Sequence, residues 1–476
     1  MFNQLFIDNR FEQGSGSRRF DAIDPATEAL ITTLPLADEG DVDRAVRSAH
    51  AAFKSWRLTT PAERTRLLLK AAALIDQRKD QIAQLETLDM GKPLRESYAN
   101  VARSVRTFEY AAGATDKLQG ESIPVDSRTL NFTRLEPLGV TAHITPWNYP
   151  FANACRSVPV ALATGCTAVV KPASDTCLTT LLLGDILREA GFPPGVVNII
   201  TGSGSVAGAA LARHLLVRAI TFTGSVDTGR RIAQYAAEHV RPVVLELGGK
   251  NPQVVCADAD MALALKETLR GGFMNAGQVC TGVSRVLVER SAYRDYVEAL
   301  KAQVDALSVG PGLDNPDLGP LVSAAHRKSV MDFVDIARAD GARLVSGGVV
   351  PAGRDQGWYY RPTVFDEVNA AMRIAREEVF GPLLVVMPFD SDDQALEIAN
   401  GVEFGLAAGI FTRDLNRAMR FVRDVEAGMA WVNEWFQSPV QVPHGGVKHS
   451  GIGREQGMVA FGNYLQSKDI AIRLPS

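Results

Sequence analysis

The N-terminal part of the chain carries apolar residues at helical spacing. In DVDRAVRSAHAAFKSWR, residues 41–57, valine, alanine, phenylalanine and tryptophan recur three or four positions apart, which predicts a helix with one buried face. A second helix is predicted in TPAERTRLLLKAAALI, residues 60–75. Thr60 is placed to cap it, Pro61 suits the first helical position, and Glu63 completes a capping box.

From residue 138 onward the pattern changes to short, β-rich apolar runs. The five runs are GVTAHITPWN, CTAVVKPA, VVNIITG, AITFTGS and PVVLELGG. Helical segments separate them, around residues 151–163, 176–190, 205–214 and 226–239. This alternation predicts an α/β fold with a doubly wound, mostly parallel sheet. A second α/β series is expected from about 250 to 440, and the final KDIAIRL alternates as an exposed or intersubunit strand does.

Composition narrows the class of protein. A chain of 476 residues is too long for one compact core, so two or three domains are expected. The net charge is only −4, with acids and bases mixed along the chain, which argues against a nucleic-acid partner. The five cysteines show no CxxC pair and no metal-ligand spacing, and they fit a reducing compartment. With neither a signal peptide nor a membrane-length apolar run, a cytoplasmic enzyme without metal or membrane partners is expected.

Polar and glycine residues cluster where the predicted strands end. Asn148, Lys171, Gly202, Ser225 and Glu246 each follow or finish one of the five runs. Ligands of doubly wound sheets bind at the carboxyl ends of the strands, so these residues are candidates for a ligand site.

Each candidate also has an ordinary structural interpretation. Cys280, in GGFMNAGQVCTG, is either a small buried residue or a thiolate nucleophile. Glu246 is either a structural ion-pair partner or a general base, and Asn148 either a turn residue or a donor to an oxyanion. The loop TGSGSVAG (201–208) either binds phosphate or makes a tight turn, because Gly208 comes one position too late for GxGxxG.

Taken together, these stretches resemble the aldehyde dehydrogenase superfamily over essentially the whole chain. The matching pieces occur in the family's order: TPWNYP, LATGCTAVVKPA, NIITGSGSVAG, ITFTGS, LELGGKNP, NAGQVCTG, EEVFGP and HGGVKHSGIGRE. The resemblance implies a Rossmann-like cofactor domain, an α/β catalytic domain and a small β oligomerisation segment. It implies NAD(P)-dependent oxidation of an aldehyde, with Cys280 as nucleophile, Asn148 as oxyanion donor and Glu246 as the base that hydrolyses the thioester.

The resemblance also implies a cofactor site. Lys171 would reach the adenosine ribose, Ser225 the pyrophosphate, and Glu378 the nicotinamide ribose. The full expected set is Thr145, Pro146, Trp147, Lys171, Ser174, Gly204, Gly208, Phe222, Gly224, Ser225, Leu247, Glu378 and Phe380.

Ser174 departs from the pattern of members that prefer NAD, which commonly have glutamate at this position. A carboxylate would repel a 2′-phosphate at close range, whereas serine can donate to it, so NADP should be tolerated or preferred. The alternative is that Asp175 or a water replaces the glutamate and NAD remains the cofactor.

The expected substrate residues are Arg156, Trp435, Ser438 and His444. Arg156 resembles the arginine with which succinate-semialdehyde enzymes hold the distal carboxylate, although the second arginine of that type is Met274 here. A polar or carboxylated semialdehyde is therefore expected, the alternative being a structural ion pair at Arg156. The lysine often found next on this helix is Ser157, which puts a lysine–glutamate proton relay to Glu455 in doubt.

Other functions stay open at this point. A betaine-aldehyde, aminoaldehyde or aromatic-aldehyde dehydrogenase is the nearest rival, because Glu434 and Trp435 suit it. Acylating members generally lack the base glutamate, so Glu246 favours hydrolysis. A non-catalytic, crystallin-like protein would not need Cys280, Glu246 and Asn148.

The resemblance also divides the chain. The cofactor domain would comprise 1–115, 136–246 and 442–459, and the catalytic domain 247–441. Residues 116–135 and 460–476 would form an oligomerisation segment whose edge strand requires a partner, so a homodimer or homotetramer is expected.

Overall fold

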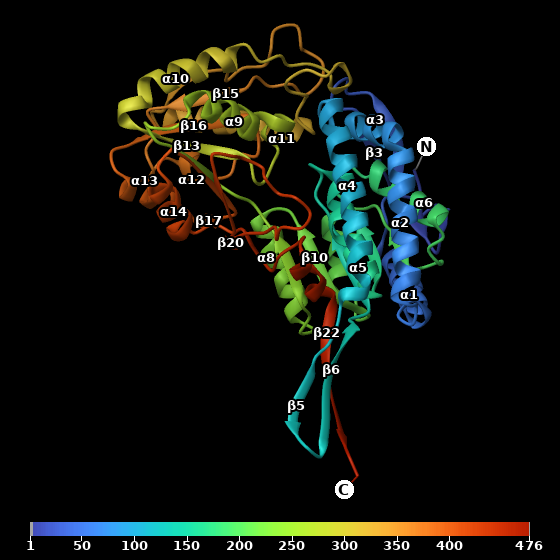
Figure 1. Ribbon diagram of the computed structural model, residues 1–476. Coiled ribbons are helices and arrows are strands. Elements are labelled where there is room, and N and C mark those ends of the chain that lie inside the picture. Colours follow the sequence, from blue (N-terminus) through green and yellow to red (C-terminus); the bar gives the residue numbers. More distant parts are fainter. Residues whose placement is uncertain (1–2, 476) are drawn as a thin grey trace.

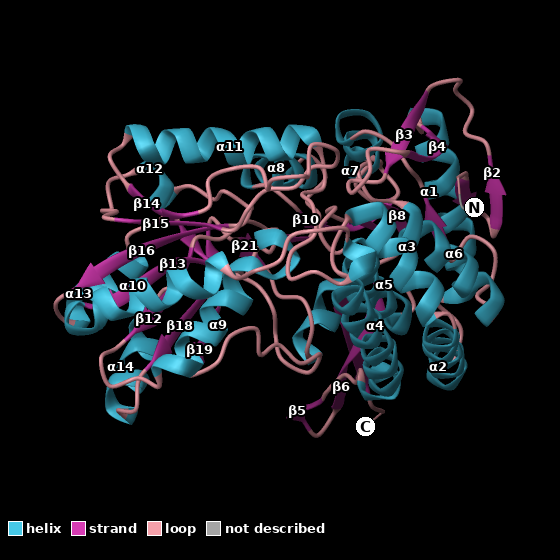
Figure 2. Ribbon diagram, turned by 90° about the horizontal axis from the view of Figure 1, so that it is seen from above, coloured by secondary structure: helices cyan, strands magenta, loops and turns pink. Residues whose placement is uncertain are grey.

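The computed structural model describes residues 3–475, which form two α/β lobes and a projecting β arm. In Figure 1 the lobe with helices α1 (Glu39–Trp56), α2 (Pro61–Gln77) and α4 (Leu94–Ala114) lies on the right, and the other lobe lies at the upper left. The two sheets lie side by side when the molecule is seen from above (Figure 2).

The first sheet has eight strands, and its centre is parallel. Their order is β2 (Arg10–Glu12), β1 (Leu5–Ile7), β9 (Val197–Ile199), β8 (Thr167–Lys171), β7 (Val140–Ile144), β10 (Val217–Thr223), β11 (Val243–Glu246) and β21 (Gly451–Ile452). Strands β7 to β11 are the five predicted from the sequence, and β1 and β21 add antiparallel partners on either side. Both β7 and β8 are buried at every position, as strands covered by helices on both faces require.

Helices cover this sheet. Besides α1, α2 and α4 they are α3 (Lys79–Met90), α5 (Pro150–Thr164), α6 (Leu178–Ala190), α7 (Ala209–Arg213) and α8 (Val226–Ala237). The capping box predicted for α2 is present, since the Thr60 side chain accepts from the Glu63 N–H and Glu63 bonds back to the Thr60 N–H. The helix predicted at 205–214 is instead a π-helical turn (Gly204–Gly208) followed by the short α7.

The chain order places a topological switch point between β7 and β10. From β7 the chain adds β8 and β9 on one side, and then returns to add β10 and β11 on the other. The connections that follow β7 and β10 therefore lead to opposite sides of the sheet, and doubly wound sheets bind ligands in the crevice at such a point. Asn148 follows β7 and Glu246 ends β11 beside this crevice.

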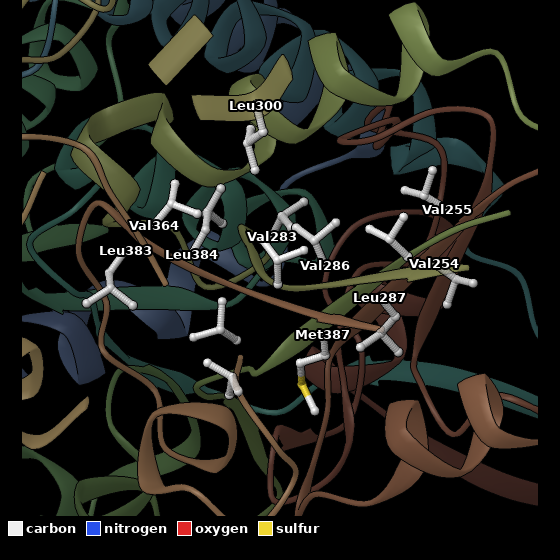
Figure 3. Packing of buried hydrophobic residues seen from close by; sticks show 14 of the residues in the cluster. Val254, Val255, Val283, Val286, Leu287, Leu300, Val364, Leu383, Leu384 and Met387 are labelled. Atoms are coloured by element: carbon white, nitrogen blue, oxygen red, sulfur yellow. The ribbon is translucent and has the colours of Figure 1, made fainter. Parts of the chain in front are cut away.

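The second sheet confirms the second α/β series. Its order is β14 (Arg343–Ser346), β15 (Thr363–Asp366), β16 (Leu383–Phe389), β13 (Val283–Glu289), β12 (Asn251–Val255), β18 (Ala407–Phe411) and β19 (Met429–Val432). The helices of this lobe are α9 (Met261–Phe273), α10 (Arg290–Asp305), α11 (Ala324–Ala339), α12 (Arg373–Arg376), α13 (Asp392–Asn400) and α14 (Leu415–Asp424). Figure 3 shows part of its core, to which Val286 of β13, Leu384 of β16 and Leu300 of α10 contribute.

The arm contains the segments predicted for oligomerisation. Strands β5 (Ser122–Asp126), β6 (Thr129–Pro137) and β22 (Leu465–Arg473) form a three-stranded antiparallel sheet that extends away from both lobes (Figure 1). Two further pairs are small: β3 (Arg19–Ile23) with β4 (Leu30–Pro35), and β17 (Phe404–Gly405) with β20 (Val447–Lys448). The division into domains stays a prediction.

Candidate active site

A cavity of about 360 Å³ lies where the two lobes face each other. Cys280, Asn148 and Glu246 all line it. Asn148 and Glu246 come from strand ends of the first sheet, whereas Cys280 precedes β13 of the second sheet. The fold thus brings together residues that are far apart in the chain. Asn148 and Glu246 are separated by 98 positions, and Glu246 and Cys280 by 34.

The segment before Cys280 has an unusual backbone. Asn275, Ala276 and Gly277 all have positive φ, of 51°, 52° and 71°. Non-glycine residues adopt this left-handed region at a cost, which surrounding contacts must offset. The Asn275 N–H donates to Glu96, and the Gln278 side chain bonds Asn275 O and the Val322 N–H. The turn is therefore fixed by hydrogen bonds to Glu96, to Val322 and within itself, and it presents Cys280 to the cavity.

The sulfur of Cys280 faces a site that favours the neutral thiol. Burial raises the pKa of the Cys280 thiol to about 12, while the charge of Arg156 opposes this shift. The other four cysteines are buried, whereas Cys280 is partly accessible. Because a thiolate is the reactive form, Cys280 needs a group that accepts its proton.

Asn148 is held rigidly at the cavity wall. One N–H of its amide donates to Gln278 O at 2.9 Å, which leaves the second N–H for another acceptor. Its backbone carbonyl accepts from Lys92 Nζ at 2.9 Å and from Asn275 Nδ2 at 3.0 Å. Lys92 is itself fully buried and pairs with Glu86 at 2.8 Å. These contacts fix the amide before any ligand arrives.

Glu246 projects from the end of β11 into the cavity. The residue is buried, and its Oε1 has no hydrogen-bond partner among the described residues. A Cβ on Gly445 would approach this oxygen to 2.5 Å, so glycine there leaves room beside the carboxyl group. Burial and the charge of Glu455 raise the pKa of Glu246 well above its usual value, while Arg156 opposes the shift. His444 Nε2 lies 4.0 Å from Glu246 Oε2.

On one side of the cavity, three rings pack edge to face. Trp147 contacts His326 and Phe380 with centroid distances of 5.0 and 5.2 Å. His326 is also hydrogen-bonded through Nε2 to Phe380 O at 2.8 Å. Glu378 lies close by, where it accepts from the Gly249 N–H at 3.0 Å, and burial raises its pKa to about 7.

The expected cofactor residues divide into two groups. Seven line the cavity: Pro146, Trp147, Gly224, Ser225, Leu247, Glu378 and Phe380. Six lie outside its wall: Thr145, Lys171, Ser174, Gly204, Gly208 and Phe222. Among the second group, Lys171 Nζ donates to Pro172 O, Ser174 Oγ donates to Gly202 O, and the ring of Phe222 packs under Gly224.

Arg156 lines the cavity but already has partners. Its Nε pairs with Glu455 Oε2, and its Nη2 donates to Thr223 Oγ1 at 3.1 Å. Ser157 stands at the position where a lysine was expected to partner Glu455. The Glu455 carboxylate pairs with Arg156 instead. Ser157 is hydrogen-bonded to His143. These contacts are those of a structural ion pair, which is the alternative interpretation of Arg156 given above.

Trp435 is placed differently from the expected pocket residue. It is fully buried, its indole N–H donates to Thr281 O at 3.0 Å, and it does not line the cavity. Trp431 and Phe436 line the cavity instead, and Ser438 and His444 lie on the wall as expected. Phe436 has a positive φ of 63°.

Comparison with known proteins identifies the family. The model of the family described as "Aldehyde dehydrogenase family" matches residues 11–470. The chain belongs to this family. It is an NAD(P)-dependent aldehyde dehydrogenase.

Individual relatives are similar over their whole length. The "Putative aldehyde dehydrogenase DhaS" of Bacillus subtilis is 40% identical over 475 residues, which cover 99% of this chain and 96% of that protein. The crystal structure of betaine aldehyde dehydrogenase from Staphylococcus aureus with NAD+ superposes with a TM-score of 0.98 at 38% identity, covering 100% of this chain and 95% of that one.

Three residues at the site of this aldehyde dehydrogenase escaped the sequence analysis. Arg103 of α4 lines the cavity, and its Nη2 donates to Ser438 Oγ at 3.3 Å. Lys92 supports Asn148, and His326 packs on Trp147. No local motif marks them, because each is brought to the site by packing between elements far apart in the chain.

Two further features bear on the class of protein. Among residues 3–475, no helix is long and apolar enough to cross a membrane. Within the same residues, no group of three or more histidine, cysteine or acidic side chains is arranged to hold a metal ion.

Proposed function

We propose that this enzyme oxidises a polar or carboxylated aldehyde to a carboxylate through a thioester on Cys280. The observation that carries the proposal is the convergence of Cys280, Asn148 and Glu246 on one cavity, with Glu246 Oε1 free to accept a proton. The thiol, the amide and the carboxyl group supply a nucleophile, an oxyanion donor and a base.

In the first step the sulfur of Cys280 adds to the carbonyl carbon. The thiol proton leaves to solvent through water in the cavity, and the carbonyl oxygen becomes an oxyanion. The free N–H of Asn148 and the backbone N–H of Cys280 donate to it. Preformed donors of this kind typically contribute about 10²–10³-fold to the rate.

Loss of hydride from the tetrahedral carbon leaves a thioester on Cys280. NAD(P)+, when bound, is the acceptor of this hydride. Glu246 then takes a proton from a water molecule, the oxygen of that water adds to the thioester carbon, and the Cys280 thiolate leaves. The released acid ionises and departs as the carboxylate, and Glu246 returns its proton to the Cys280 thiolate.

The residues on the cofactor side suit a dinucleotide. Thr145 Oγ1 is buried without a hydrogen-bond partner, and Lys171 Nζ has only a carbonyl partner, so both keep capacity to donate to ribose hydroxyls. Ser225 begins α8, whose N-terminus favours phosphate. A Cβ on Gly248 would lie 2.1 Å from Glu378 Oε2, so glycine keeps the space beside that carboxyl group open.

We infer that the enzyme accepts NADP as well as NAD, and that it either tolerates or prefers NADP. Ser174, unlike a glutamate, places no negative charge next to the ribose that Lys171 would contact. Asp175 is the competing feature, since it interacts electrostatically with Lys171. The S. aureus structure that this chain resembles contains NAD+.

A second substrate class has specific support. The S. aureus neighbour is a betaine aldehyde dehydrogenase, and Trp431 and Phe436 give this cavity the aromatic surface that a quaternary ammonium or an aromatic aldehyde would contact. The cationic side chains on the same wall oppose the quaternary ammonium.

We also propose a homodimer or homotetramer. The arm exposes apolar side chains, with Val125 62% and Ile472 46% accessible, and β22 has an unpaired edge in its sheet. Such an edge is usually covered by another chain. Sedimentation velocity at micromolar concentration distinguishes these assemblies from a monomer.

The mechanism is tested by Glu246→Gln. We expect the variant to retain a burst of NAD(P)H but to release carboxylate at least 100-fold more slowly, because the neutral amide cannot activate water. Intact-protein mass spectrometry should then show an acyl adduct on the Cys280 peptide. A variant that turns over at the wild-type rate, or one without adduct or burst, would contradict this role.

The pH dependence follows from the raised pKa of Glu246. The base form is lost as the pH falls through this raised pKa, so deacylation in the wild type should slow at lower pH. In Glu246→Gln this dependence should disappear from the deacylation step. Stopped-flow measurements across the pH range separate this step from the burst.

A further inference from the structure

We propose that Arg103, assisted by Ser438, binds an anionic group of the substrate at the opposite end from the aldehyde. This inference rests on the proposed function and specifies its substrate class as semialdehydes that carry a carboxylate. It assigns the recognition of charge to helix α4 rather than to Arg156.

Arg103 is an exposed cation on the cavity wall without an anion beside it. It lies on the face of α4 that lines the cavity, as do Asn100, Ser104 and Thr107. Its Nη2 donates to Ser438 Oγ at 3.3 Å, and within residues 3–475 no carboxylate oxygen comes within 4.0 Å of its guanidinium nitrogens. The guanidinium of Arg103 stays charged, as arginine side chains do in proteins.

Arg156 provides the contrast. Both arginines line the same cavity, yet the charge of Arg156 is balanced by Glu455 and its Nη2 is bonded to Thr223. Glu246 also acts on Arg156 electrostatically. Removing Arg156 would therefore leave two carboxyl groups without their cation, whereas Arg103 has donors to spare. The free donors belong to Arg103.

The acidic groups of the cavity lie elsewhere. Glu246 ends β11, and Glu378 is bonded to Gly249, so both belong to the strand-end side of the cavity. The groups that act on Arg103 are Arg156, Tyr149 and Cys280, none of them acidic at neutral pH. A cation on a cavity wall without a counterion favours an anionic ligand, and arginine binds carboxylates through paired hydrogen bonds.

The expected substrate follows from this arrangement. Its aldehyde reaches Cys280, its chain passes the apolar surfaces of Trp431 and Phe436, and its carboxylate meets Arg103 and Ser438. A substrate with a quaternary ammonium at that end would place two positive charges together. Betaine aldehyde is therefore expected to be a poor substrate.

Steady-state kinetics test the assignment. The substrates are ω-carboxylated semialdehydes of four to six carbons, the neutral aldehydes of the same lengths, and betaine aldehyde. We expect Arg103→Gln to lower kcat/KM for the carboxylated series 10- to 100-fold, mainly through KM, and to change the neutral series less than threefold. Arg103→Lys should restore part of the loss.

The matched control is Arg106→Gln. Arg106 lies on the same helix, is exposed and pairs with Glu109, so the change removes one charge from α4 without altering the cavity. It should leave both series unchanged. Equal losses for carboxylated and neutral aldehydes in Arg103→Gln, or a wild-type preference for betaine aldehyde, would overturn the proposal.

A binding measurement separates this proposal from the mechanism. Succinate and glutarate should slow the alkylation of Cys280 by iodoacetamide in the wild type and in Arg106→Gln, but not in Arg103→Gln. Choline should give no protection. If the enzyme oxidised no aldehyde, the proposed function would be wrong, but protection of Cys280 by dicarboxylates would still test the anion site. If dicarboxylates gave no protection in the wild type, the proposed anion site would be refuted.

Discussion

The two sides of the cavity are built differently. The cofactor side is made of strand ends, glycines and a helix start, so backbone positions define it at Gly224, Ser225 and Leu247. The substrate side is made of side chains from α4 and from the segment after β19, such as Arg103, Phe436 and Ser438. The first side is fixed by the sheet itself, whereas the second can change with single substitutions while the sheet stays intact.

This difference separates what the family shares from what distinguishes its members. The backbone of a surface defined by strand ends cannot move without rebuilding the sheet, which suits the cofactor that all reactions of the enzyme use. A surface defined by side chains on one helix can be re-charged residue by residue. The charge of Arg103 therefore carries more information about the substrate than the fold does.

The largest effect is expected where the two sides meet, at Cys280. Cys280→Ala removes the only nucleophile in the proposed mechanism, so dehydrogenase activity should fall by at least about 10³-fold. Cofactor binding, followed by fluorescence titration, should change little because Cys280 is not part of the strand-end surface. Substantial turnover in this variant would show that the two sides do not converge on this sulfur.

The next effect concerns the support beneath the cofactor side. Lys92→Met leaves Glu86 buried without its cation and frees the Asn148 carbonyl, so unfolding free energy should fall by about 3–5 kcal/mol. Chemical denaturation measures this loss. Lys79→Met, at an exposed lysine on α3, should change stability by less than about 0.5 kcal/mol. Equal stability of the two variants would show that the Lys92–Glu86 pair does not stabilise the cavity wall.

The smallest effect concerns Ser174. Ser174→Glu adds a carboxylate where the 2′-phosphate of NADP would lie, so the ratio of kcat/KM for NADP to that for NAD should fall about tenfold, or about 1.4 kcal/mol. Ser174→Ala is the control, since it removes the hydroxyl without adding charge. An unchanged ratio in Ser174→Glu would mean that this residue does not face the ribose.

The sequence predicted the strand-end side in more detail than the helix side. Five runs of β-branched residues, with the capping box at Thr60 and Glu63, were sufficient to place the first sheet and the residues at its carboxyl edge. These features are local, since periodicity and capping depend on neighbours in the chain. They also led to Asn148 and Glu246, which share the cavity with Cys280.

The other side depended on contacts that no local pattern records. Arg103 occupies a position of an amphipathic helix that reads as surface, and only the packing of α4 against the segment around Ser438 turns that surface into a cavity wall. Trp435, expected in the pocket, is instead buried with its indole N–H bonded to Thr281 O, a contact between segments far apart in the chain that no local pattern records.

The arm has a practical consequence for handling the protein. Strand β22 ends at Arg473, far from both lobes, so any affinity tag joined to the C-terminus begins at the tip of the arm beside the exposed side chains of Leu130 and Ile472 (Figure 1). Strand β1, by contrast, is buried in the first sheet, and the N mark in Figure 1 lies beside the lobe on the right, away from the arm. An affinity tag placed before β1 leaves the arm unmodified. The oligomeric state should therefore be measured on N-terminally tagged and C-terminally tagged preparations side by side.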